Sequence, residues 1–546
     1  MFLPAVLLGG VLPAAGASDA SVGGVVVNDS TGKPVHMALV TLSTTGAKPM
    51  EAAVYTDANG VFQFNAVPPG RYYLYAGEFR YQNVAFGAPT PDRYPAILTL
   101  GAGEVRQGIE LRMRPLGAIS GVVLDQNGDP LPRVAVQLLV STWARGRKTS
   151  AYRNAALSND RGEFRIHGIA PGRYFLSATV QFAQAVETRS QVTLGEPVPD
   201  MVFGRAWYPK AARIQEARPV EVKAGADVRD IVLQMTTTAA AGVSGHIELP
   251  DGANATGGIL VNFVPQDEGG GMPAIKTAFS NDQKFALAGL APGRYTAITM
   301  LQGDDQYRGV DEVDLQPGPQ EVVLHLTKGV RLAGRLEVQG AGTGDLTQYR
   351  IALIPGDITP VGRNRLHAPV EPDGTFAFAA VTSGVWDIGV QPIPKGGYFK
   401  SMKLGDQDVL TEEMTITPYT NAPLQIVLSA RGGVLSGKVR VPDDSVSDQR
   451  GRPSAIVLLA PVGRFSHVES FFMMRPADEA GRYEMRGITP GSYKLFAFDR
   501  LEPNSLQDPD FMARIDPLGK PVEVHEGDEI SLDLDVRPAA PAGAGQ

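Results

Sequence analysis

The chain has 546 residues, which exceeds what one hydrophobic core usually supports, so several domains are expected. Its 62 Gly and 42 Pro, together with 43% hydrophobic residues, suit many short strands joined by tight turns. The net charge of −8 leaves no basic excess to neutralise phosphates, which argues against nucleic-acid binding. The absence of cysteine excludes disulfides, zinc–thiolate sites and thiol nucleophiles.

The N-terminal segment has the pattern of an export signal. An apolar run from Phe2 to Leu12 is followed by Ala15-Gly16-Ala17, a small-x-small cleavage site, so residues 1–17 are predicted to be a signal peptide. No Lys or Arg precedes the apolar run, so a frayed apolar N-terminus is the alternative. No later stretch reaches the roughly 18 consecutive apolar residues of a membrane helix, and no membrane span is expected in the mature chain.

The rest of the chain repeats one unit about five times. Each copy opens with a strand built around a glycine, continues through an acidic-x-x-Gly-x-aromatic element and a Pro-Gly-x-Tyr corner, and closes with alternating apolar residues. The predicted domains are residues 18–115, 116–240, 241–328, 329–430 and 431–538, followed by a disordered tail over 539–546. The opening glycines are Gly24, Gly121, Gly245, Gly334 and Gly437.

The chemistry of the unit predicts strands and tight turns. Alternation such as Phe62-Gln63-Phe64 has period two, which places one face toward a core and the other toward water. Asp, Asn and Gly in the turns supply the positive φ that hairpins require. The tyrosine after each Pro-Gly is expected to bury its ring and to hydrogen-bond its hydroxyl near the corner. The predicted fold is therefore all-β, a tandem array of about five antiparallel β-sandwich domains.

These motifs resemble the carboxypeptidase regulatory-like domain. The second unit shows the order best, with "SGVVLDQNGDPLPRVAVQL" over 120–138, then "DRGEF" and "APGRY". The resemblance implies a prealbumin-like or Ig-like sandwich, grouped with carbohydrate-binding folds, in a multi-copy secreted protein. The third unit lacks the turn glycine, and the fourth has Ser383-Gly384-Val385-Trp386 at the corner, so the third and fourth domains are predicted to be degenerate copies.

No constellation of residues predicts catalysis. The seven histidines do not fall at metal-ligand spacing, and no nucleophile or phosphate-loop motif is present, so no enzymatic activity, metal or cofactor is expected. The turn residues Asp57, Asn59, Asp160 and Asp373 could offer oxygen ligands to calcium. Each turn holds only one or two of them, which favours an ordinary Asx turn.

Two sets of residues are candidates for binding. Flat aromatic rings stack on sugars, so the predicted carbohydrate-binding residues are Trp143, Trp207 and Tyr208. The segment 141–157 contains no acid and is a possible contact loop for an acidic sugar, a lipid head group or a protein. Its basic residues are Arg145, Arg147, Lys148 and Arg153. A solvated hairpin explains the same loop, and core packing is the alternative for the tryptophans, above all for Trp386.

Two functions fit this pattern. The first is a non-catalytic, exported binding protein that recognises polysaccharide through its β-sandwich modules. The second is a structural spacer or adhesin-like array that contacts a cell-surface protein and has no glycan ligand. An exposed aromatic strip on one sandwich would favour the polysaccharide-binding protein. Exposed apolar edges between units would favour the structural or adhesin-like array. Either would act in the periplasm, on the outer surface or outside the cell. Because the links between units are short, we expect an extended or bent array in which no unit folds back on a distant one.

Overall fold

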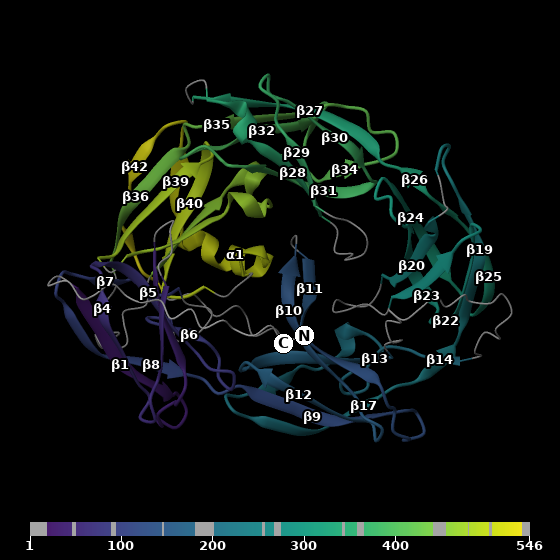
Figure 1. Cartoon of the computed structure of the whole chain (residues 1–546), viewed down its shortest axis with the longest axis horizontal. Coiled ribbons are helices and arrows are strands. Elements are labelled where there is room, and N and C mark those ends of the chain that lie inside the picture. Colours follow the sequence, from purple (N-terminus) through teal and green to yellow (C-terminus); the bar gives the residue numbers. More distant parts are fainter. Residues whose placement is uncertain are drawn as a thin grey trace.

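The computed structural model describes residues 19–45, 51–88, 94–144, 147–180, 201–253, 257–266, 275–340, 344–356, 365–440, 455–478, 480–501 and 505–537. Five successive units, each a sandwich of two sheets around an apolar core, make up this part of the chain, which confirms the predicted all-β fold. Figure 1 shows the units following one another around a ring, with one sheet of each unit on the outer rim and the other on the inner side.

The outer sheet of each unit contains the glycine strand at its centre. In the first three units the strand order is β4 (Val61–Val67), β1 (Ala20–Asn28), β8 (Val105–Met113); β12 (Glu163–Ile169), β9 (Gly117–Leu124), β17 (Asp227–Gln234); and β22 (Lys284–Leu290), β19 (Ala241–Glu248), β25 (Gly318–His325). In the fourth and fifth units the outer sheet comprises β30 (Thr375–Val381), β27 (Val330–Gln339), β35 (Leu424–Ser429), β32 (Tyr398–Leu404), β33 (Gln407–Asp408); and β39 (Arg482–Ile488), β36 (Gly433–Arg440), β42 (Glu529–Ser531), β43 (Leu534–Asp535).

The inner sheet of each unit contains the strand that follows the Pro-Gly corner. The first two inner sheets comprise β3 (Glu51–Tyr55), β2 (Leu39–Thr44), β5 (Gly70–Gly77), β6 (Val84–Ala85), β7 (Leu98–Leu100); and β11 (Arg147–Leu157), β10 (Val134–Ala144), β13 (Gly172–Val180), β15 (Ala206–Trp207), β16 (Val220–Val222). The other three comprise β21 (Lys276–Ser280), β20 (Ile259–Pro265), β23 (Gly293–Leu301), β24 (Tyr307–Leu315), β26 (Thr327–Lys328); β29 (Leu366–Pro369), β28 (Arg350–Pro355), β31 (Gly384–Gln391), β34 (Met414–Ile416); and β38 (Met473–Pro476), β37 (Ile456–Pro461), β40 (Gly491–Phe498), β41 (Lys520–Val524).

The remaining elements are short. The second unit adds the strand pair β14 (Met201–Phe203) and β18 (Thr237–Ala239). The helical elements are η1 (Ile214–Glu216), η3 (Leu346–Gln348), η5 (Gly463–Phe465), η6 (Glu469–Phe471), η7 (Ser505–Gln507), α1 (Pro509–Ile515) and η8 (Asp516–Leu518). Asp508 begins α1, because its carboxylate accepts the backbone N–H groups of Asp510 at 2.9 Å and Phe511 at 3.3 Å.

The opening glycine of each unit lies where two parallel strands come closest. In every outer sheet the first strand pairs in parallel with a strand near the end of the unit, an addition to the antiparallel pairing expected from sequence. A Cβ atom on Gly121 would lie 1.9 Å from the carbonyl oxygen of Ile231, and one on Gly245 would lie 1.7 Å from that of Val322. No side chain fits at these separations, which explains why glycine recurs there.

The acidic turns are closed by their own backbone. In the first unit Asp57 Oδ1 accepts the N–H groups of Asn59 at 2.9 Å and Val61 at 2.8 Å, and Gly60 takes a φ of +72°. These bonds are those of an Asx turn, the structure that the sequence favours for these residues. In the third unit Gln283 takes the glycine's place and adopts a φ of +66°.

The Pro-Gly corners are tied by one recurring hydrogen bond. The tyrosine hydroxyl donates to the carbonyl oxygen four residues earlier, as in Tyr174 to Ala170 at 2.7 Å and Tyr493 to Thr489 at 2.7 Å. In the fourth unit Trp386 donates its Nε1–H to Thr382 O at 2.9 Å. Trp386 therefore takes the place of the tyrosine in the core, in agreement with the core-packing interpretation of this tryptophan. The expectation that each corner residue is buried and hydrogen-bonded is confirmed.

Neighbouring units are joined by more than the chain between them. The fourth and fifth units share side chains, because Phe465 and Phe471 of the fifth unit pack in the apolar core of the fourth. At the same junction Glu526 of the fifth unit accepts a hydrogen bond from the buried Ser429 of the fourth at 2.6 Å and pairs with Lys400 at 3.4 Å. The hydrogen bond from Ser429, aided by Lys400, holds the pKa of Glu526 below its ordinary value.

Acid is expected to loosen the joint between the fourth and fifth units. A carboxylate with a depressed pKa in the folded state stabilises that state above its unfolded pKa, and the contribution is lost as the pH falls through the lower folded pKa. Glu526→Gln should therefore lower the melting temperature at pH 7 and make no difference once the pH is well below 4.5, the ordinary glutamate value. The exposed Glu523→Gln on β41 is the matched control. A Glu526→Gln deficit that persists in acid would contradict this assignment.

The first and fifth units meet, which corrects the expectation of an array without contacts between distant units. Tyr94 of the first unit packs against an apolar cluster of the fifth that includes Phe498, Phe511 and Ile515. The short links do keep neighbours in contact, as expected, but each link turns the chain in the same sense. These turns add up until the first and fifth units lie side by side, as Figure 1 shows.

Candidate functional site

Trp207 does not offer an exposed ring. It is 2% exposed and packs with Leu139 and Ala211, while the Arg205 guanidinium lies 4.8 Å from the centre of its ring. A sugar cannot stack on a buried ring, so the prediction that Trp207 belongs to a binding surface is wrong. Tyr208 is half-buried against the core of the second unit.

The basic segment forms a hairpin in place of a loop. β10 and β11 pair from Ala135 opposite Leu157 to Ala144 opposite Arg147, which agrees with the hairpin alternative. Trp143 is half-buried and lies opposite the exposed Lys148, and Arg153 is exposed farther along β11. Arg145 lies outside the described residues. The structure does not place Trp143 in the cluster around Trp207, and sugar binding by Trp143 or Tyr208 stays a prediction.

The inner sheet of the first unit differs from those of the second, third and fifth units in what covers it. The residue three positions after the corner tyrosine points away from the core, and in the second, third and fifth units it is buried: Ser177 and Ile298 are 0% exposed and Phe496 is 4% exposed. In the fifth unit α1 covers this face. In the first unit the equivalent residue is Tyr75, which is 39% exposed. The first unit therefore leaves an aromatic surface open.

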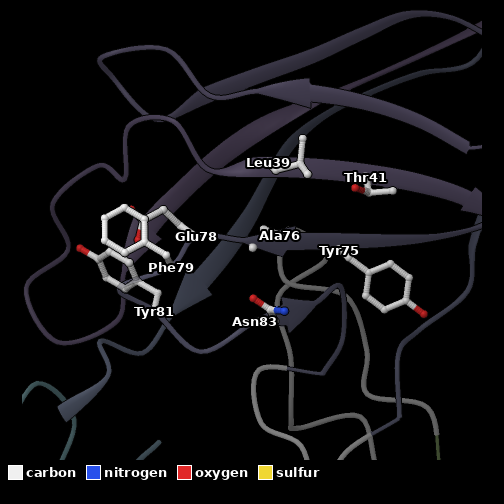
Figure 2. Close-up of a pocket in the computed structure, with 9 residues that line it drawn as sticks. Leu39, Thr41, Tyr75, Ala76, Glu78, Phe79, Tyr81 and Asn83 are labelled. Atoms are coloured by element: carbon white, nitrogen blue, oxygen red, sulfur yellow. The ribbon is translucent and has the colours of Figure 1, made fainter. Parts of the chain in front are cut away.

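This surface, which we call the aromatic face, lies on β2, β3 and β5 and the loop after β5. Thr41 stands opposite Tyr75, and Leu39 stands opposite both Tyr55 and Gly77. Figure 2 shows the side chains of Leu39, Thr41, Tyr75, Phe79, Tyr81 and Asn83 along an open groove of about 610 Å³. The exposed apolar and aromatic members of the face are Leu39, Tyr55, Tyr75 and Phe79.

The polar groups of the groove are of two kinds. The side chain of Glu78 is almost fully buried and is bound by Arg80, whose Nε and backbone N both lie 2.8 Å from its carboxylate oxygens. The Arg80 guanidinium lies 5.2 Å from the ring centre of Phe79. The Glu78–Arg80 pair holds the loop in place. Burial, with a smaller contribution from Tyr73, raises the pKa of the Tyr75 phenol, which therefore remains a hydrogen-bond donor at neutral pH. The second kind comprises the hydroxyl of Thr41 and the amide of the exposed Asn83, which line the groove and can hydrogen-bond a ligand.

Sequence reasoning missed these residues, although a signal was present. In "RYYLYAGEF" the tyrosines fall in both registers of β5: Tyr72 is buried at the corner, whereas Tyr73 and Tyr75 alternate onto the opposite face. The tyrosine content of the outward register, in addition to the tryptophans, would have indicated the aromatic face. Whether such a face is exposed depends on which elements pack over it, and a local sequence pattern does not contain that information.

The described residues show neither a metal centre nor a membrane helix. In the described part of the chain, no three His, Asp or Glu side chains are grouped so that they could hold a metal ion. Among the helices described, none has the length and hydrophobicity needed to cross a bilayer.

Comparison with known families identifies the first unit. Residues 21–103 match the carboxypeptidase regulatory-like domain. The resemblance inferred from the glycine strand, the acidic turn and the Pro-Gly corner is thus confirmed there. No curated protein matches the chain.

Solved structures align with the chain only loosely. The minor pilin GBS52 of Streptococcus agalactiae is 14% identical, and the match covers 40% of this chain and 96% of the pilin with a TM-score of 0.23. The shaft pilin SpaA of Lactobacillus rhamnosus GG is 12% identical, with coverages of 41% and 98% and a TM-score of 0.21. Two B repeat units of the collagen-binding protein of Staphylococcus aureus are 12% identical, with coverages of 71% and 94% and a TM-score of 0.14. Matches of this kind carry no argument about function.

Proposed function

We propose that the protein is a non-catalytic, exported scaffold of β-sandwich units that binds an extended polypeptide through the aromatic face of its first unit. The observation that carries the proposal is the exposure of Tyr75 at a position where three other units bury the equivalent residue. An uncovered cluster of aromatic and aliphatic side chains on a rigid sheet is typical of a binding surface. The proposed location outside the cytoplasm rests on the apolar segment over residues 2–12.

A polypeptide suits this face for two reasons. Leu39 and Phe79 stand beside the tyrosines, and such a mixture packs well against apolar side chains. In addition, β3 forms an edge of its sheet, where the order is β3-β2-β5-β6. An edge strand can pair with an extended segment of a partner, which gives affinity through the backbone while nearby side chains give specificity.

A neutral polysaccharide is the second candidate. The rings of Tyr73 and Tyr75 have centres 6.2 Å apart, and the hydroxyl of Thr41 and the amide of Asn83 lie close by. Stacking surfaces with adjacent hydroxyl and amide groups also suit sugar rings, so the tyrosines of the first unit are a candidate carbohydrate surface in place of the buried Trp207.

Affinity selection from a library of short, free random peptides, beside a panel of cello-, xylo- and chitohexaose, tests both candidates. We expect enriched peptides to bind the full chain and Tyr75→Ala or Tyr55→Ala to weaken them about tenfold, because a central aromatic residue contributes about 1–2 kcal/mol to such a contact. Val105→Ala, on the outer sheet of the same unit, is the control and should leave binding unchanged. Enrichment of hexasaccharides alone would favour the second candidate. Peptide affinities that Tyr75→Ala and Tyr55→Ala leave intact would remove the aromatic face from the site.

A further inference from the structure

Among the five junctions between neighbouring units around the ring, the one between the first and fifth units has no direct chain connection. The first and fifth units hold the two ends of the described chain, and they meet where Tyr94 packs against the apolar cluster beneath α1. We call this contact the seam. Phe511 and Ile515, four residues apart on one face of α1, are both buried in that cluster.

The other junctions are bound more firmly. Between the first and second units, Leu116 N donates to Arg80 O at 2.8 Å and Gly225 N to Pro115 O at 2.9 Å. Between the fourth and fifth, Gly432 N donates to Gly396 O at 3.0 Å, beside the Ser429–Glu526 bond. These junctions combine a covalent link with backbone hydrogen bonds, whereas no direct chain link joins the first unit to the fifth. The seam is therefore the place where the ring opens most easily.

The aromatic face lies on the inner side of the ring. In the first unit β1, β4 and β8 form the outer rim, and β5 and β6 lie inside (Figure 1). The core lies between the two sheets, so the free face of the inner sheet is turned toward the interior of the ring. The hairpin of β10 and β11 reaches into the same interior, where β10 contacts η7 of the fifth unit.

We propose that the closed ring is an autoinhibited form, in which the seam controls access of large partners to the aromatic face. Small molecules reach the groove in the closed ring, since Tyr75 and Phe79 are exposed to solvent. A folded protein that presents the extended segment needs the first unit to swing away from the fifth before that segment can meet the face. The proposal rests on the aromatic face being the binding surface, but access to the face is measurable without any ligand.

The absence of cysteine from the chain allows a direct test. Thr41→Cys places a thiol in the groove, opposite Tyr75, and Val105→Cys places one on the outer sheet of the same unit. Each variant of the full chain is treated with N-ethylmaleimide and, separately, with a bulky polyethylene-glycol maleimide. We expect the small reagent to label both positions. The bulky one should label Thr41→Cys about tenfold more slowly than Val105→Cys, because labelling must await opening of the seam.

A seam variant completes the experiment. Tyr94→Ser removes the ring that packs against the fifth unit, and in the Thr41→Cys background it should raise the rate of the bulky reagent about tenfold without changing that of Val105→Cys. Spin labels on Asn59→Cys and Glu523→Cys, one on each side of the seam, report the opening itself as a longer and broader distance distribution. Equal labelling of Thr41→Cys and Val105→Cys by the bulky reagent in the parent chain would overturn the proposal. An unchanged rate at Thr41→Cys after Tyr94→Ser would overturn it as well, whether or not the label distance grows.

The labelling rates of Thr41→Cys and Val105→Cys do not depend on any peptide ligand. The peptide-binding proposal and the autoinhibition proposal can therefore fail independently of each other.

Discussion

Gly121→Ala is expected to destabilise the second unit by about 3 kcal/mol, although it adds a single methyl group. The new Cβ would lie 1.9 Å from the carbonyl oxygen of Ile231, which belongs to the backbone of the paired strand β17. A flexible side chain could move aside, but this oxygen is fixed by the parallel pairing of β9 and β17. The strands must separate locally or the unit must unfold.

Denaturant unfolding followed by tryptophan fluorescence measures this effect, because Trp143 and Trp207 both lie in the second unit. Gly204→Ala is the matched control in the same unit. The nearest heavy atom to its new Cβ is 3.9 Å away, so it should change stability by less than about 0.5 kcal/mol. If Gly121→Ala unfolds at the same denaturant concentration as the parent chain, the close approach of β9 and β17 is not present in solution.

Tyr174→Ala is expected to cost about 3–5 kcal/mol, through the loss of a large buried ring and the cavity left behind. Tyr174 is buried, and its hydroxyl donates to Ala170 O at 2.7 Å, so it fills the core and also ties the corner. Tyr174→Phe separates the two contributions, since it keeps the ring and loses only the hydrogen bond, at about 1 kcal/mol.

The same fluorescence transition reports both tyrosine variants. We expect the transition of the second unit to move to lower denaturant in the order parent chain, Tyr174→Phe, Tyr174→Ala. Equal effects of the two substitutions would assign the stabilisation to the hydrogen bond. A shift of every transition of the chain together would show that the ring unfolds as one cooperative body.

The features predicted correctly from sequence are those set by local chemistry. Tyr174 and Tyr493 bond to carbonyl groups only four residues away, and Asp57 bonds within its own turn, so a short motif contains all the participants. The parallel pairing of Gly24 with Ile109 joins residues far apart in the chain. The opening glycine and the closing alternation are each visible in the sequence, but neither segment contains a signal that the two strands pair.

The candidate site was harder to predict because exposure is a tertiary property. Trp207 was expected at a surface, yet Leu139 and Ala211 pack around it. Tyr75 belongs to a repeated strand that looks much the same in every unit, and only the packing of neighbouring elements decides whether its face is open. Closure of the ring at Tyr94 depends on the sum of several small turns between units, which no single link reveals.

The parallel strand pairs also determine how the protein meets mechanical tension. The chain enters each unit at one end of its first strand and, because the partner strand runs in the same direction, leaves near the opposite end. A pull on both ends slides the two strands lengthwise, so that their hydrogen bonds are strained together, whereas a hairpin pulled from its open end separates one bond at a time. In the third unit this pairing runs without interruption from Ala241 opposite Gly318 to Glu248 opposite His325. A chain stretched between two anchored points would therefore meet its greatest resistance at the glycine strands, once in every unit.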